Sequence, residues 1–283
     1  MKRVSVITNF NIPGKAAVAE KVIQKFLECG AEVAAPYYAK GRVDCRIPVL
    51  MPGAKLYDNA DIIVVIGGDG SVLDAARRAA EREIPILGIN KGRLGYMTEL
   101  EVNELDLIEK VMNGEYRIEK RSMLKVQAVS GTKVFHENRA LNDAVISNGA
   151  VARMVDLEVY EDGTLIDAYR ADGMIVSTPT GSTAYSLSAG GPVIDPRVKG
   201  VCITPVCAHS LVSRSMVFPS ESVIEVKNTC EREPNLFLTI DGRVNIRLDH
   251  GNIVRVMSSE KMTKLIRVKD KKKYSELFKK LYS

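Results

Sequence analysis

The stretch Ile62-Ile-Val-Val-Ile-Gly-Gly-Asp-Gly-Ser71 joins a run of five β-branched residues directly to three glycines and an aspartate. A short apolar run bounded by polar residues predicts a buried strand over 61–66. A helical pattern over 72–82 follows, and Ser71 is placed to cap that helix, with Asp74 three residues on. The stretch therefore predicts a strand, a glycine loop and a helix, which is the repeating unit of an α/β sheet.

The same alternation extends to both sides of this stretch over about the first 118 residues. Short apolar runs predict strands over 4–7, 32–35 and 86–89, and apolar residues at helical spacing predict a helix around 18–27. Continuous apolar strands separated by helices are typical of a parallel sheet with crossover connections. We therefore predict an α/β N-terminal domain with a parallel sheet over residues 1–120.

The pattern changes near residue 121, where alternating apolar and polar residues predict half-buried strands. One alternating run over 155–159 precedes the turn dipeptide Asp162-Gly163, and another over 238–248 is interrupted by Asp241-Gly242. A further strand is predicted over 253–257. The second half of the chain is therefore predicted to be a β-rich antiparallel domain.

The composition is that of an ordinary globular protein: 283 residues, 46% hydrophobic, 27% charged and a net charge of +5. No apolar run approaches the roughly 18 residues that a membrane span needs, and we expect no secretory signal. Six lysines lie between Lys269 and Lys280, with apolar residues at helical spacing among them. We interpret this tail as an amphipathic helix docked on the core, and we expect neither a nucleic-acid partner nor a membrane anchor.

The cysteines give no sign of a disulfide framework or a zinc site. Their number is odd, no CxxC occurs, and no histidine pair completes a metal-ligand set; they stand at positions 29, 45, 202, 207 and 230. We expect buried free thiols in a reducing compartment and a cytoplasmic protein.

The glycine loop is the sharpest local feature. Gly67, Gly68 and Gly70 permit a close backbone approach, and amides at the start of a helix favour phosphate. A carboxylate among phosphate-binding glycines is unfavourable by charge alone, so Asp69 is expected to hold a metal or to take a proton. A plain strand-to-helix turn with Asp69 as a local cap is the simpler alternative. The loop matches neither GxxxxGK[ST] nor GxGxxG.

A second feature is the segment Ser177-Thr-Pro-Thr-Gly-Ser-Thr-Ala-Tyr-Ser-Leu-Ser-Ala-Gly-Gly191, which follows Asp172-Gly173 and an apolar strand. Seven aliphatic hydroxyls lie between Ser177 and Ser188. Buried hydroxyls need partners, so such a segment suits a polyhydroxylated, phosphorylated ligand, with Tyr185 for stacking. A surface loop is the alternative.

A third feature is the pair Asn142-Asp143, which lies between a helix-like or loop segment and the apolar run 144–146. A carboxylate can accept hydrogen bonds from two hydroxyls of one ribose. Taken alone, however, the pair is more typical of a turn.

In this order, the three features resemble the NAD kinase family over roughly residues 1–258. The resemblance also includes the stretch 88–96, which is similar to the family's NxGxLGF motif, and the stretch 121–124, which is similar to its domain junction. GGDG alone is shared with lipid kinases and phosphofructokinases, which are the first alternative. The segment 177–191 favours NAD kinases.

The resemblance implies a fold, a reaction and partners. It implies the two domains above, 1–120 and 121–258, with a C-terminal segment 259–283 that returns to the first domain. It implies phosphoryl transfer from ATP, or polyphosphate in some members, to the 2′-hydroxyl of the adenosine ribose of NAD. It further implies a divalent metal, usually Mg²⁺, with no dedicated protein ligand assigned, and a homodimer or homotetramer whose NAD site is shared between subunits.

The resemblance also implies roles for individual residues. Asp69 would be the catalytic carboxylate. The nucleotide- and NAD-binding residues would be Gly67, Gly68, Gly70, Ser71, Asn90, Tyr96, Asn142, Asp143, Arg153, Arg170, Asp172, Thr180, Thr183, Ala184, Tyr185, Ser188 and Arg243.

Three of these positions depart from the family pattern without removing the catalytic carboxylate. Asp143 replaces the more usual glutamate, Tyr96 replaces a phenylalanine, and Arg243 stands where many members have glutamine. A non-catalytic NAD(P)-binding regulator of the same fold is a second alternative, and a hydride-transfer enzyme is a third.

Overall fold

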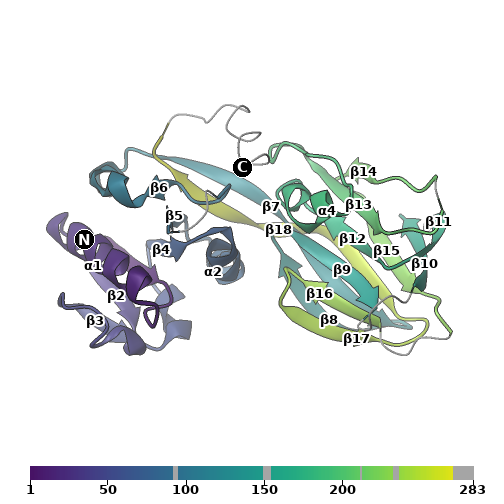
Figure 1. Ribbon diagram of the computed structural model, residues 1–283, viewed down its shortest axis with the longest axis horizontal. Helices are drawn as coiled ribbons and strands as arrows, with labels where there is room; N and C mark the ends of the chain where they lie inside the picture. Colours follow the sequence, from purple (N-terminus) through teal and green to yellow (C-terminus); the bar gives the residue numbers. More distant parts are fainter. Residues whose placement is uncertain (92–94, 149–153, 211, 232–235, 270–283) are drawn as a thin grey trace. The chain divides into compact units, whose positions relative to one another are not determined.

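The computed structural model describes residues 1–91, 95–148, 154–210, 212–231 and 236–269 (Figure 1). The chain forms two compact units, one of Met1–Lys120 with the chain from Thr263, the other of Arg121–Met262. The second division lies inside strand β18 (Ile253–Arg267) rather than at residue 258, because this strand runs much further than the predicted 253–257. The predicted lysine-rich helix lies outside the described residues.

The first unit contains a parallel sheet, as predicted. Its strand order is β18-β5-β4-β1-β2-β3, and β6 pairs with β5; each of these pairings is parallel. Strand β4 is buried along its whole length, which accounts for its uninterrupted apolar sequence. The strands are β1 (Arg3–Ile7), β2 (Glu32–Pro36), β3 (Val49–Met51), β4 (Ile62–Gly67), β5 (Ile86–Asn90), β6 (Leu100–Glu101) and the start of β7 (Arg117–Ser130).

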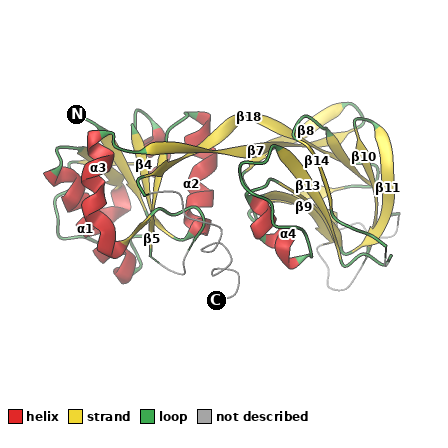
Figure 2. Cartoon of the chain, turned by 90° about the horizontal axis from the view of Figure 1, so that it is seen from above, coloured by secondary structure: helices red, strands yellow, loops and turns green. Residues whose placement is uncertain are grey.

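Helices cover both sides of this sheet: α1 (Pro13–Glu28) and α3 (Ile108–Asn113) lie on one side, α2 (Asp69–Glu81) on the other (Figure 2). Helix α1 begins at Pro13, where a missing amide hydrogen costs nothing. Helix α2 turns alanines toward the sheet, and these small side chains allow a close approach to β4. Short 3-10 turns complete the unit: η1 (Tyr37–Ala39), η2 (Gly53–Tyr57) and η3 (Val102–Leu107).

The second unit is antiparallel and β-rich, as predicted. A six-stranded sheet has the order β14-β13-β12-β9-β16-β17, and strands β11, β10, β15 and β18 pair in that order in another layer. One apolar core joins side chains from both layers. The remaining elements are β8 (Lys133–Ala140), β9 (Asp143–Asn148), β10 (Val155–Glu161), β11 (Thr164–Ala171), β12 (Gly173–Ser177), η4 (Gly181–Thr183), α4 (Tyr185–Ser188), β13 (Gly200–Val206), β14 (Met216–Pro219), β15 (Ile224–Asn228), β16 (Leu236–Ile240) and β17 (Val244–Leu248).

Both predicted Asp-Gly turns are present. Asp162 and Gly163 have φ of 47° and 79° between β10 and β11, and Asp241 and Gly242 have φ of 50° and 69° between β16 and β17. Left-handed φ at both positions suits the twist of a hairpin, and aspartate and glycine tolerate it better than other residues. The dipeptides therefore fix where these strands reverse.

Several local expectations are wrong. Ser71 does not cap α2, because the helix begins at Asp69 with Gly68 as its N-cap. The segment before Asn142 is the strand β8, not a helix-like or loop segment. All five cysteines are free as expected, yet only Cys202 and Cys230 are buried, and Cys207 is exposed. Among the described residues, no helix is long and apolar enough to cross a membrane.

Candidate functional site

The glycine loop connects β4 to the first turn of α2. Gly67 has no room for a side chain, because a Cβ there would lie 2.2 Å from Ser71 Oγ. A Cβ on Gly68 or Gly70 would meet nothing within 4 Å. The fold itself therefore requires a glycine only at position 67, and the other two leave open space beside the helix N-terminus, where amide hydrogens favour an anion.

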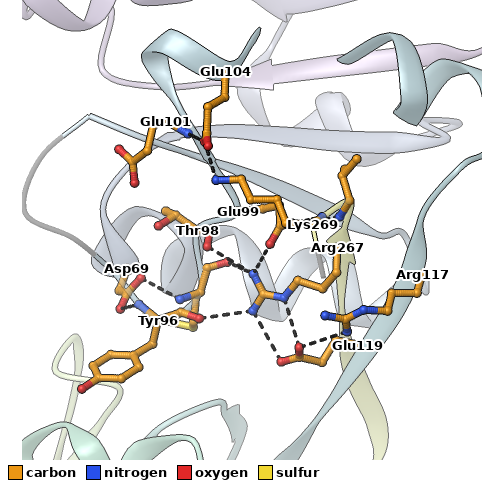
Figure 3. Close-up of polar contacts among 12 residues, drawn as sticks. Asp69, Tyr96, Thr98, Glu99, Glu101, Glu104, Arg117, Glu119, Arg267 and Lys269 are labelled. Carbon is orange, nitrogen blue, oxygen red and sulfur yellow. Dashed lines mark hydrogen bonds and ion pairs between the residues drawn. The ribbon is translucent and has the colours of Figure 1, made fainter. Parts of the chain in front are cut away.

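The carboxylate of Asp69 is held by backbone amides from another part of the chain. Tyr96 N–H donates to Oδ2 over 2.6 Å and Met97 N–H donates to Oδ1 over 2.9 Å. Figure 3 shows the carboxylate turned toward this segment, with the Tyr96 ring pointing away from it. A Cβ on Gly95 would lie 2.2 Å from Asp69 Oδ1, so this glycine makes room for the carboxylate.

Two lysines lie close to the loop. Lys15 Nζ is 3.9 Å from the Cβ position of Gly67, and the Lys91 N–H donates to Gly67 O at 3.0 Å. The half-buried Lys15 belongs to α1, and Lys91 directly follows β5. A cation at the Lys15 position adds to the anion-attracting field at the start of the helix.

Asn90 and Tyr96, both predicted to bind nucleotide, make contacts within the first unit. Asn90 is buried, and its Nδ2 donates to both carboxylate oxygens of Glu101, at 3.2 and 3.1 Å. Tyr96 is half-buried, and its burial, followed by the negative charge of Asp69, raises the pKa of its phenol. Its ring therefore stays neutral and can pack against a ligand.

In the second unit, Asn142-Asp143 is organised by the carboxylate of Asp241. Asp241 Oδ1 accepts the amides of Asn142 at 2.8 Å and Asp143 at 3.2 Å, while Oδ2 accepts that of Leu141 at 2.9 Å. Backbone amides that point at a carboxylate stabilise its charged form. Asp241 therefore fixes the backbone of Asn142 and Asp143 where β9 begins, in addition to its place in the hairpin turn.

The carboxyl of Asp143 is itself buried. Burial, together with the nearby charge of Asp241, raises its pKa from 3.8 to about 7. Near neutral pH this group therefore exists in both protonation states, and the proton allows it to donate as well as accept a hydrogen bond.

The hydroxyl-rich segment satisfies many of its own polar groups. Thr178 Oγ1 donates to Leu141 O at 2.6 Å, Ser182 Oγ donates to Pro179 O at 2.7 Å, and Ser186 bonds with Thr204 at 2.9 Å. The expectation that the hydroxyls of this segment serve mainly a ligand is thus wrong for Thr178, Ser182 and Ser186, whose hydroxyls bond within the protein. Buried hydroxyls need hydrogen-bond partners, and these three find them within the protein.

The predicted ligand-binding residues of this segment fall into two groups. Thr180 is buried, and its hydroxyl accepts a bond from Arg121 at 3.2 Å. The others are accessible: Thr183 and Ala184 are half-buried, and Tyr185 and Ser188 are exposed. Accessible positions lie around the short helix α4, which is where a ligand can meet the segment.

Three further predicted residues belong to the second unit. Asp172 is half-buried between β11 and β12, and Arg170 on β11 is exposed and pairs with Asp156 at 4.0 Å. Arg243 is exposed, next to the turn that contains Asp241. Arg153 lies outside the described residues.

The part of the chain that the structure describes contains no group of three or more acidic, histidine or cysteine side chains that could hold a metal ion. A divalent cation that keeps several waters is commonly bound by one or two carboxylates together with substrate phosphates. The single carboxylate of Asp69 beside an anion-favouring helix start fits binding of the cation by one carboxylate together with substrate phosphates.

Three contributors were missed by the sequence analysis. Asp241 was expected only as a turn residue, and neither Lys15 nor Arg267, which contacts the segment that holds Asp69, was singled out. An Asp in a left-handed turn is a weak signal for an amide-binding carboxylate. The other two residues carry no local signal, because their partners lie far away in the chain.

Residues 53–116 match the model of the ATP-NAD kinase N-terminal domain, and residues 141–268 match that of the ATP-NAD kinase C-terminal domain. A Caldanaerobacter subterraneus subsp. tengcongensis protein named NAD kinase is 40% identical over 274 residues, which cover 95% of this chain and 95% of that protein.

Two solved structures have a similar fold. An Archaeoglobus fulgidus NAD kinase in complex with ATP has a TM-score of 0.75 and 26% identity, over 100% of this chain and 99% of that one. A yeast NADH kinase complexed with NADH has a TM-score of 0.86 and 22% identity, over 100% of this chain and 87% of that one. The second likeness concerns the fold alone.

Proposed function

This chain belongs to the NAD kinase family, and we propose that Asp69 is the base that activates the acceptor hydroxyl for its reaction. The chain is a phosphotransferase that uses ATP to phosphorylate NAD. The acceptor is the 2′-hydroxyl of the adenosine ribose. A ribose hydroxyl is a poor nucleophile at neutral pH, so positioning and charge neutralisation dominate the reaction.

The observation that carries this role is the fixed carboxylate of Asp69 beside open glycines. Amides of Tyr96 and Met97 hold one oxygen each. Each oxygen keeps a second lone pair, so the carboxylate can still accept the proton of an incoming hydroxyl. General base catalysis of this kind contributes about 10²–10⁴-fold.

The donor phosphates are proposed to lie against the open faces of Gly68 and Gly70. The start of α2 offers backbone amides there, and Lys15 adds a positive charge. Mg²⁺ is proposed to enter with ATP, where it neutralises phosphate charge. The A. fulgidus relative in complex with ATP supports a nucleoside triphosphate donor, and polyphosphate use stays a prediction.

The NAD side is proposed to involve the second unit. Asn142 and Asp143 would contact the nucleotide, as would Asp172, and the accessible residues around α4 would line the adenine and ribose pocket, namely Thr183, Ala184, Tyr185 and Ser188. A homodimer or homotetramer that shares the NAD site through Arg153 and Arg170 is part of the proposal, as is a cytoplasmic location.

The proposal is tested with Asp69→Asn and with Asp74→Asn as a matched control on the exposed face of the same helix. We expect NADP formation from NAD, ATP and Mg²⁺ by the wild type and the control, and a loss of about 10²-fold or more in kcat for Asp69→Asn. Polyphosphate is run as the second donor. Wild-type turnover by Asp69→Asn would show that this carboxylate is not the base.

A further inference from the structure

The end of β18 carries a buried arginine that contacts the segment next to Asp69. Arg267 is 6% exposed. Its guanidinium donates to three successive carbonyls: Tyr96 O at 3.2 Å from Nη2, then Met97 O at 3.3 Å and Thr98 O at 3.2 Å from Nη1 (Figure 3). A single side chain therefore fixes the backbone of residues 96–98 from one side.

The other side of the same backbone holds the carboxylate. The peptide unit between Tyr96 and Met97 has its carbonyl oxygen on Arg267 and its N–H on Asp69 Oδ1. Because a peptide unit is planar and rigid, a movement of its oxygen also moves its N–H. A positive charge on the carbonyl also polarises the unit and strengthens its N–H as a donor.

Two carboxylates hold the guanidinium in place. Glu99 Oε2 lies 3.3 Å from Nη1, and Glu119 Oε2 lies 3.1 Å from Nε. The other oxygen of Glu99 accepts the amides of Val268 and Lys269, at 2.8 and 2.7 Å. Arg267 thus donates to the segment 96–98, and Glu99, which directly follows that segment, accepts amides of the chain after Arg267. The guanidinium therefore has little freedom to turn.

We propose that Arg267 is a positioning residue for Asp69, which acts by clamping residues 96–98 so that two amides keep the carboxylate in its reactive orientation. This inference rests on the proposed catalytic role of Asp69. The geometry requires a planar fork with several donors, because three carbonyls and two carboxylates share one cation. A lysine ammonium supplies the same charge as a point and lacks this fork.

The alternative is that Arg267 only balances the charges of two buried or half-buried carboxylates. That role needs a positive charge at the site and does not depend on the orientation of the 96–97 peptide. Arg267→Lys separates the two roles, because it keeps the charge and removes the three-carbonyl clamp. Arg267→Met removes both.

The first arm of the test observes the peptide directly, without activity. The chain has ten methionines, so selective ¹⁵N-methionine labelling gives a small set of amide resonances, and Met97→Leu assigns the one of interest. We expect the Met97 amide proton to move upfield in Arg267→Lys, because its bond to Asp69 lengthens. Asp69→Asn should move the same resonance in the same direction. An unchanged Met97 resonance in Arg267→Lys would overturn the proposal.

The second arm measures kinetics with Lys264→Met as the matched control. Lys264 lies three residues earlier on β18 and pairs with Glu83 at 3.1 Å. We expect Arg267→Lys to lose about 10²-fold in kcat, the cost of a misplaced catalytic group, with the KM values for NAD and ATP within about threefold of wild type. The control should keep both parameters.

The outcomes distinguish the clamp by Arg267 from a role of its charge alone and from the catalytic role of Asp69. Wild-type kcat in a folded Arg267→Lys would show that charge alone suffices and would overturn the clamp. A loss of kcat that simply follows lost thermal stability across Arg267→Lys and Arg267→Met would also overturn it. If instead Asp69→Asn keeps its turnover while the Met97 resonance moves in Arg267→Lys, the clamp stands and the proposed base fails.

Discussion

The carboxylate of Asp241 gives the most specific prediction about how the second unit builds its part of the site. It accepts three consecutive amides, those of residues 141, 142 and 143. In Asp241→Asn, one oxygen becomes an NH₂ group. The oxygen is best kept at Oδ1, where it serves two amides, and the NH₂ then faces the Leu141 N–H, so that two donors meet.

The magnitude follows from these contacts. One buried amide loses its partner, which costs about 1–3 kcal/mol, and two bonds change from a charged to a neutral acceptor, which costs about 1 kcal/mol each. The lost charge of Asp241 also relieves repulsion with Asp143 wherever Asp143 is ionised. We therefore expect a loss of about 3–5 kcal/mol in unfolding free energy near pH 6 and a smaller loss near pH 8.

The assay is urea unfolding followed by far-ultraviolet circular dichroism at both pH values. Asp162→Asn is the matched control, because Asp162 also has a left-handed φ before a glycine but accepts one exposed amide, that of Val223 at 3.0 Å. Asparagine tolerates this φ as well as aspartate does. The control should lose about 1 kcal/mol or less.

Kinetics provide an independent reading, since Asp241→Asn should raise the KM for NAD more than it lowers kcat. If Asp241→Asn loses no more stability than Asp162→Asn near pH 6, the three-amide contact does not organise residues 141–143. A loss that grows from pH 6 to pH 8 would refute the assigned repulsion with Asp143.

Two further predictions concern the same region. Because burial raises the pKa of Asp143 to about 7, the folded state binds its proton more tightly than the unfolded state, and this contribution to stability is lost as pH rises from about 4 through 7. Asp143→Asn lacks this proton linkage, so its unfolding free energy relative to the wild type should rise by about 3 kcal/mol from pH 5 to pH 8. Urea unfolding at both pH values measures this change, and an unchanged difference would contradict the buried carboxyl. Gly181→Ala places a Cβ 2.0 Å from Asn142 O, so it should destabilise the protein by about 1–3 kcal/mol and raise the KM for NAD. Gly190→Ser is the control, because a Cβ there meets nothing within 4 Å although φ is +88°. It should cost only backbone strain and leave the KM for NAD unchanged.

The fold was largely predictable because its signals are local. The buried run before Gly67 and the Asp-Gly dipeptides at 162 and 241 mark strands and reversals without reference to distant residues. The bounds of β18 were not predictable, because its second half alternates weakly and is stabilised by pairing with β5 through Leu265 and Ile86. Ser71 was misassigned because a serine in the first turn of a helix looks like a cap when the helix start is uncertain.

The hydrogen bonds inside the candidate site were not predictable from the sequence. The composition of residues 177–191 indicates a polar, ligand-related segment, yet only the structure separates hydroxyls that bond inward, such as Thr178, from accessible positions such as Ser188. Residue type gives the capacity for a hydrogen bond, and burial with geometry decides which bond forms.

The sequence by itself determined that an apolar strand, a glycine loop and a helix follow one another and that Asp69 lies in the glycine segment between them, because apolar periodicity and glycine act over a few residues. Only the tertiary structure decided what holds that carboxylate. Its amide partner Tyr96 is 27 residues away, and Arg267, on the far side of the same peptide, is 171 residues from Tyr96. Such partners meet because a parallel sheet brings the ends of distant strands together, and no local pattern in either segment encodes the other.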